Sequence, residues 1–196
     1  MATMRSPILT ALSVTATILL TSAASAQQEM PNLSDWHEAS QKAAKQMMDK
    51  YGPPAEVTET SLVWHETGTW KRTMISKEAV DHNFPMPHPD VMEQVIDYDV
   101  PVDFFDDLAA YDGSVIVERT KGEISARCDK EEANFLALNL ANDIVTKKRT
   151  WEEARTFYAD TIKALMAGDK PEYTQGFVFD VSKEDIKNPD QPAAKM

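Results

Sequence analysis

The sequence predicts a single α+β domain: an antiparallel sheet of about five to six strands with helices packed on one face, including a C-terminal helical pair. Two observations predict this architecture. Most β-rich segments follow one another through tight turns, which pair neighbouring strands antiparallel. Two amphipathic helical segments then follow each other through a short loop, which favours an antiparallel pair of helices.

The first 26 residues are predicted to be a cleavable signal peptide. Arg5 precedes an uncharged apolar run at 8–20, and small residues end the segment at Ala24 and Ala26. The run of 13 residues is shorter than the roughly 20 that a membrane-spanning helix needs. We therefore expect cleavage between Ala26 and Gln27, and a periplasmic or secreted protein without a membrane span.

The rest of the chain is expected to be one domain over residues 27–181, followed by a polar, mobile tail over 182–196. The chain carries a formal net charge of −12 at pH 7, and such a surface repels the phosphates of nucleic acids. We therefore expect no nucleic-acid partner. Cys128 is the single cysteine, so no intramolecular disulfide is possible and the core must hold the fold.

The N-terminal part of the domain is predicted to be a helix followed by a hairpin. Apolar residues recur at helical spacing over 32–50, and Gly52 is the expected stop of this helix. Two β-rich segments at 61–65 and 70–75 flank the turn residues 66–69. We expect these segments to pair as a β-hairpin.

The central part is predicted to continue with a strand, a short helix and a second hairpin. Alternating residues indicate a strand at 92–100, and Pro101 suits the first turn of a helix that ends near Tyr111. A turn then separates the β-rich segments 114–119 and 123–128.

The C-terminal part is predicted to contain the helical pair and a last strand. Capping boxes at 129–132 and 150–153 indicate where the two helices begin. Alternating apolar residues at 177–181 predict a strand after them.

Three motifs give the chain a resemblance to known proteins. They are Y-G-P-P at 51–54, H-N-F-P-M-P-H-P-D at 82–90 and A-R-C-D at 126–129. Together they resemble a group of exported bacterial proteins of uncharacterised function, over most of the mature chain. This resemblance implies no activity.

A second resemblance covers residues 32–75 only. The succession of a helix, Gly52-Pro53 and a hairpin that carries Trp64 and Trp70 is similar to small outer-membrane assembly lipoproteins of the BamE/SmpA type. This chain departs from that pattern because it has no lipid-attachment cysteine and adds a second half. The resemblance therefore implies a local fold and nothing about function.

The proline-rich segment 81–90 displays His82, Met86 and His88, residue types that suit copper. Alternating prolines favour polyproline II, whose rise of about 3.1 Å per residue separates the two histidines by roughly 19 Å. A shared metal site would need a turn, for example through a cis proline. We expect a rigid connector whose Phe84 and Met86 dock on the core, with binding of copper or another metal by His82, Met86 and His88 as the alternative.

Cys128 precedes a predicted helix, and a helix N-terminus can lower the pKa of a thiol and make it a nucleophile. The acidic residues Asp129, Glu131 and Glu132 crowd the same helix end and oppose thiolate formation. We therefore expect Cys128 to be a small buried residue. Catalysis by Cys128 and an intermolecular disulfide are the alternatives.

The aromatic residues offer a further place for a ligand. Trp64 and Trp70 lie on one predicted hairpin, and core packing is the first interpretation of both. With Phe84 they are also candidates for a ligand pocket or partner surface.

These observations favour an exported, non-enzymatic accessory or binding protein whose ligand is an unidentified protein or small molecule. The sequence has no G-x-S-x-G elbow, no H-E-x-x-H motif and no Gly-rich phosphate loop. Two alternatives stay open: a metal-handling protein that uses the His/Met segment, and a Cys128-dependent enzyme.

Overall fold

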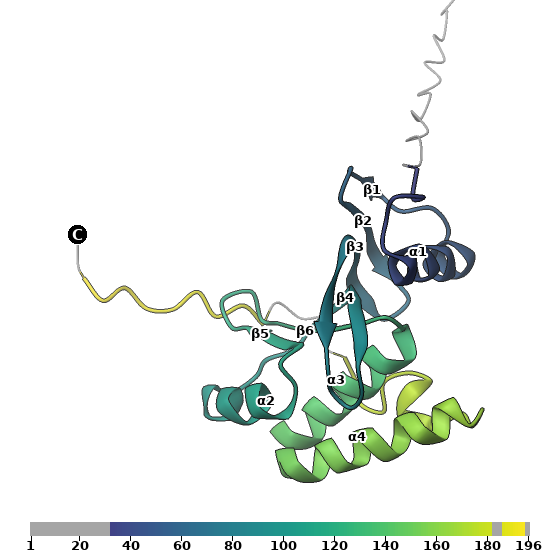
Figure 1. The fold of residues 1–196 in the computed structure, drawn as a ribbon. Coiled ribbons are helices and arrows are strands. Elements are labelled where there is room, and N and C mark those ends of the chain that lie inside the picture. Colours follow the sequence, from purple (N-terminus) through teal and green to yellow (C-terminus); the bar gives the residue numbers. More distant parts are fainter. Residues whose placement is uncertain (1–31, 182–185, 195–196) are drawn as a thin grey trace, which may run out of the picture.

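A computed structural model describes residues 32–181 and 186–194, so the predicted signal peptide lies outside the described residues. The described chain forms one six-stranded sheet, with the strand order β1-β2-β3-β4-β6-β5 and antiparallel pairing throughout (Figure 1). The strands are β1 (Glu56–Val57), β2 (Ser61–Thr67), β3 (Trp70–His82), β4 (His88–Asp97), β5 (Val115–Glu118) and β6 (Glu123–Cys128). The predicted fold class is confirmed.

Four α-helices and two short 3₁₀ helices accompany the sheet in the described residues. They are α1 (Glu38–Tyr51), η1 (Val102–Phe104), α2 (Phe105–Tyr111), α3 (Glu131–Val145), α4 (Trp151–Met166) and η2 (Glu172–Thr174). Helices α1, α2 and α3 contact the sheet, whereas α4 packs on α3 and α2 as an outer layer (Figure 1). None of the described helices is both long and apolar enough to cross a membrane.

Helices α1 and α3 lie on the same face of the sheet because of the alternation of side chains along β4. Successive side chains of a strand point to opposite faces, so Met92, Gln94 and Ile96 share one face. Met92 belongs to the apolar cluster that contains α1, and Ile96 belongs to the cluster that contains α3. One face of β4 therefore contributes side chains to both apolar clusters of the core.

The segment 81–90 is not the polyproline connector that the prolines predict. β3 extends to His82 and β4 begins at His88, and residues 83–87 form the turn between these two paired strands. The Phe84–Pro85 peptide bond in this turn is cis. The local preference of the prolines gives way because the chain on both sides is held in a long hairpin.

Two further local predictions are wrong in detail. Residues 32–37 precede α1 rather than belonging to it, because the His37 N–H donates to the Lys77 carbonyl and ties them to β3 (3.1 Å). The predicted capping box at 129–132 does not form: Lys130 is the N-cap of α3, and no side chain caps it. The box at 150–153 is confirmed, with both of its reciprocal hydrogen bonds.

No strand forms at 177–181. The side chain of Asn139 in α3 holds this part of the chain instead. Its Nδ2 donates to the carbonyls of Tyr173 (3.0 Å) and Gly176 (2.8 Å), and its Oδ1 accepts from the Val178 N–H (2.9 Å). Because these backbone groups are satisfied by a side chain, the segment packs on the core without joining the sheet.

Candidate metal centre

The end of the β3–β4 hairpin brings two histidines and one aspartate together. His82 is the cross-strand partner of His88, and Asp90 follows two residues after His88 on β4. Cross-strand partners point to the same face, as do residues two apart on one strand. The antiparallel register therefore places all three side chains on the helix-covered face of the sheet.

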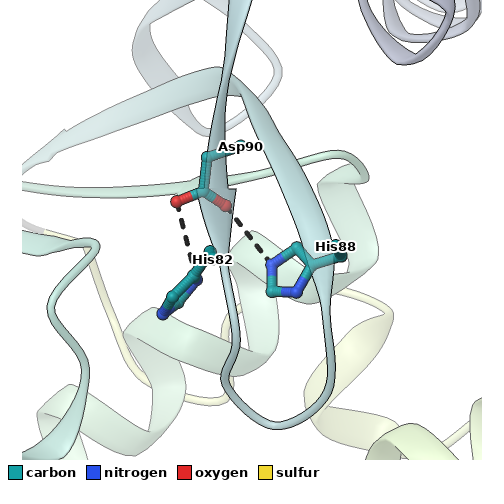
Figure 2. Close-up of side chains that lie close together, drawn as sticks. All are labelled: His82, His88 and Asp90. Atoms are coloured by element: carbon teal, nitrogen blue, oxygen red, sulfur yellow. Dashed lines mark ion pairs between the residues drawn. The ribbon is translucent and has the colours of Figure 1, made fainter.

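The donor atoms of these three residues lie within 4.8 Å of one another. Figure 2 shows the Asp90 carboxylate between the two imidazoles, with one oxygen toward each ring. The distances are 3.5 Å from His82 Nδ1 to Asp90 Oδ2 and 3.3 Å from His88 Nε2 to Asp90 Oδ1. Two ligands of a tetrahedral Zn²⁺ ion, bound at about 2.0–2.1 Å, lie about 3.3–3.4 Å apart. Each imidazole nitrogen thus lies at about ligand spacing from one oxygen of the carboxylate.

The loop between α2 and β5 completes the surroundings of the site. The Ser114 hydroxyl donates to Asp90 Oδ2 and lies 3.4 Å from His82 Nδ1. Asp112 Oδ1 accepts from the Ser114 N–H (2.8 Å) and lies 3.5 Å from His82 Nε2. Burial raises the pKa of Asp112, an effect that its contacts with Ser114 and His82 partly offset. Asp112 therefore orients the ring of His82 from the side opposite Asp90.

The backbone fixes the orientation of His88. Its Nδ1–H donates to the Met86 carbonyl (2.8 Å), because a carbonyl oxygen only accepts. In the neutral ring the lone pair is then on Nε2, the nitrogen that faces Asp90. Burial opposes the charged ring, but the Asp90 carboxylate and the adjacent Cys128 outweigh it and raise the pKa of His88. An ion that binds at Nε2 must therefore displace a proton.

One oxygen of Asp90 is among the four buried side-chain polar atoms of the described residues that have no hydrogen-bond partner. The residue is 3% exposed, and among the described residues its Oδ1 has no hydrogen-bond partner. Oδ1 is close enough to His88 for an ion pair, but the two groups are not aligned for a hydrogen bond. A buried carboxylate oxygen without a hydrogen bond is costly, so Oδ1 depends on its ion pair with His88 and keeps its lone pairs free for a ligand.

An open hollow gives access to the two histidines. It has a volume of about 410 Å³ and is lined by His37, Asp81, Asn83, Pro87 and Pro89, together with His82 and His88. No Lys or Arg is among these described lining residues. With Asp81 in its wall and Asp90 and Asp112 behind it, the hollow favours a cation electrostatically.

The structure also locates the other residues singled out in the sequence. Trp64 and Trp70 are 2% and 1% exposed, and their indole N–H groups donate to the Gly52 carbonyl and to Glu131. Phe84 packs on the core beneath the guanidinium of Arg155 (3.8 Å). Met86 reaches the site through its backbone carbonyl, while its side chain is 43% exposed.

Cys128 is buried at the end of β6, next to His88. Burial raises the pKa of its thiol, and the nearby imidazole only partly offsets this. The thiol is thus protonated near neutral pH, which is unfavourable for a nucleophile.

Sequence reasoning missed Asp90, Asp112 and Ser114 as parts of a site. The available signal was the spacing of His88 and Asp90, which alternate as on a strand. Asp112 and Ser114 carry no such signal, because the contact with Asp90 joins residues far apart in the chain.

Comparison with protein-family models, curated proteins and solved structures finds no match to this chain. Function is therefore argued from the geometry of the site.

Proposed function

We propose that this chain is an exported protein that binds a divalent transition-metal ion through His82, His88 and Asp90. The observation that carries the proposal is the buried Asp90 Oδ1, which has no hydrogen bond among the described residues and lies 3.3 Å from His88 Nε2. An ion bound at this oxygen satisfies it directly.

The donor set defines the class of ion. Two imidazoles and one carboxylate suit Zn²⁺, Cu²⁺, Ni²⁺ and Fe²⁺. Three protein ligands leave at least one coordination position open, and the histidines line a hollow open to solvent. Asp112 beside His82 and the Met86 carbonyl at His88 are the outer partners that metal-binding histidines require.

This proposal takes up the alternative of a metal-handling protein in place of the accessory protein favoured by the sequence. It also changes the expected set of ligands, which was His82, Met86 and His88. Asp90 takes the place given to Met86, whose contact with His88 is made by its carbonyl. The Cys128-dependent enzyme gains no support, because burial raises the pKa of the thiol. Trp64 and Trp70 have no part in the proposed function.

The test is a metal titration of the purified protein, in competition with a chromophoric chelator, using Zn²⁺ and Cu²⁺ separately. We expect uptake of one ion per chain and a raised melting temperature, since a ligand that binds only the folded state stabilises it. Asp90→Asn and His82→Ala should each weaken binding by more than about 100-fold, because both remove a direct ligand.

His65→Ala is the matched control. His65 is exposed on β2 and pairs with Glu56, away from the hairpin end. Its removal should leave metal affinity unchanged. Equal affinity of the wild type and Asp90→Asn, or an equal loss in His65→Ala, would show that the ion binds elsewhere.

Export is tested separately. Expression of the full chain with its own leader should yield a mature protein in the periplasm or medium whose intact mass begins at Gln27. A full-length protein that stays in the cytoplasm would contradict this part of the proposal.

A further inference from the structure

His88 lines a second hollow besides the one described above. This second hollow has a volume of about 550 Å³ and lies between the hairpin turn, the end of β6 and the C-terminal half of α4. Tyr158, Ile162 and Leu165 of α4 form its apolar wall. The two hollows share His88 but differ in the chemistry of their other residues.

Three sulfur-bearing side chains line the second hollow. Met86 comes from the hairpin turn, Cys128 from the end of β6, and Met166 is the last residue of α4. Three separate elements thus contribute two thioethers and a thiol to the lining of one hollow, which His88 also lines.

The exposure of the two methionines is unusual for this protein. Met86 and Met166 are 43% and 67% exposed, whereas Met47 and Met92 are 2% and 0% exposed. Core packing accounts for the second pair but not for the first. Both exposed thioethers line the hollow that also reaches the buried thiol of Cys128.

The donor types of the two hollows favour different ions. Imidazole and carboxylate at His82 and Asp90 suit a divalent ion, whereas thioethers and thiolate select the softer Cu(I). The side chain of Met has three rotatable bonds, so thioethers at the rim can turn toward an ion inside the hollow.

We propose that the second hollow binds a cuprous ion through Met86, Met166 and Cys128. Binding to Cys128 replaces the thiol proton by a copper–sulfur bond and releases that proton to solvent. Copper enters and stays as Cu(I), so no electron is transferred. This site goes beyond the proposed function and does not require the divalent site to be occupied.

The experiment is an anaerobic titration of the purified protein with Cu(I) in competition with bicinchoninate, repeated with Ag(I) as a redox-inert probe. We expect stoichiometric binding of either ion. Replacement of both rim residues, Met86→Leu with Met166→Leu, should weaken Cu(I) binding by more than about 100-fold while keeping apolar side chains at these two positions. Cys128→Ser should remove the thiolate-to-copper absorption in the near ultraviolet.

Met74→Leu is the matched control, because Met74 is a half-buried methionine of β3 that does not line the hollow. Unchanged Cu(I) affinity in the double methionine variant would overturn the proposal. Loss of Cu(I) binding in Asp90→Asn would also overturn it, since the ion would then occupy the divalent site.

An apolar occupant gives a distinct result. If the double methionine variant loses binding of a fluorescent apolar dye but keeps its Cu(I) affinity, the hollow is a pocket for an apolar molecule and the cuprous site is wrong. If Cu(I) binds as expected but Zn²⁺ and Cu²⁺ do not bind, the proposed function fails and the cuprous site stands.

Discussion

Two buried carboxylates lie near the same face of β4, and they differ in how far their oxygens are satisfied. Glu131 of α3 is 6% exposed, and its Oε1 accepts from Tyr51 and Trp70, both at 2.7 Å. Its Oε2 accepts from Lys50, and Gln94 of β4 lies 3.5 Å from Oε1. Glu131 therefore joins α1, β3 and β4 to α3.

Asp90 is as deeply buried, but it accepts a hydrogen bond at one oxygen only among the described residues, from Ser114. Its other contacts are two histidines whose rings are 4.9 Å apart. A fully paired buried carboxylate is explained by the fold it holds together. A buried carboxylate whose second oxygen has an ion pair with an imidazole, but no hydrogen bond among the described residues, has the free oxygen that the proposed metal site requires.

The largest expected effect is on folding at Glu131. Glu131→Ala should lower the free energy of unfolding by about 3 kcal/mol, because it leaves the buried indole N–H of Trp70 without an acceptor. Urea denaturation measures this, and metal affinity should not change. Lys50→Ala is the control: Lys50 is half exposed, so its loss should cost less than about 1 kcal/mol.

The next effect concerns the orientation of Asp90. Ser114→Ala should weaken divalent-metal affinity by about tenfold, because the hydroxyl holds Oδ2 and so leaves Oδ1 for the ion. Ser40→Ala, another buried serine whose hydroxyl donates to the Lys77 carbonyl at 3.3 Å, is the matched control in the same titration. An equal loss of affinity in both variants would point to general destabilisation.

A smaller effect is expected on metal-free stability at Asp90. Asp90→Asn should lower the free energy of unfolding by less than Glu131→Ala does, because it removes the ion pairs with His82 and His88 but leaves no buried donor without an acceptor and keeps the volume of the side chain. Denaturation in the presence of a chelator measures it. A loss as large as that of Glu131→Ala would mean that Asp90 is a structural tie of the same kind.

The smallest effect is expected at Glu123, a carboxylate paired with partly exposed cations. Burial raises its pKa, but Lys71 and Arg72 outweigh this, and the net pKa is lowered. A lowered folded-state pKa stabilises the protein above the unfolded value of about 4.3, and this stability is lost as the pH falls toward the folded value. The difference in stability between the wild type and Glu123→Gln should therefore shrink between about pH 6 and pH 3. A constant difference across that range would be the contrary result.

Several parts of the fold follow from local sequence. The turn residues between β2 and β3 and between β5 and β6 lie beside alternating segments, and both hairpins form. Gly52 ends α1 with a φ of 81°, a conformation that glycine adopts at little cost. Thr150 and Glu153 cap α4 through bonds between neighbours in the chain. Each of these features depends on residues that are close in sequence.

The candidate metal centre depends on contacts between residues that are far apart in the sequence. His82 faces His88 because of the pairing of β3 with β4, and Asp90 is covered by Ser114 from another loop. In the same way, apolar residues alternate over 177–181, but no strand forms there. The side chain of Asn139 in α3 accepts the hydrogen bond of the Val178 N–H instead. The sequence alone determined the fold class and the residue types His82 and His88. Only the tertiary structure decided that His82, His88 and Asp90 meet, because strand register and the burial of Asp90 are set by long-range packing.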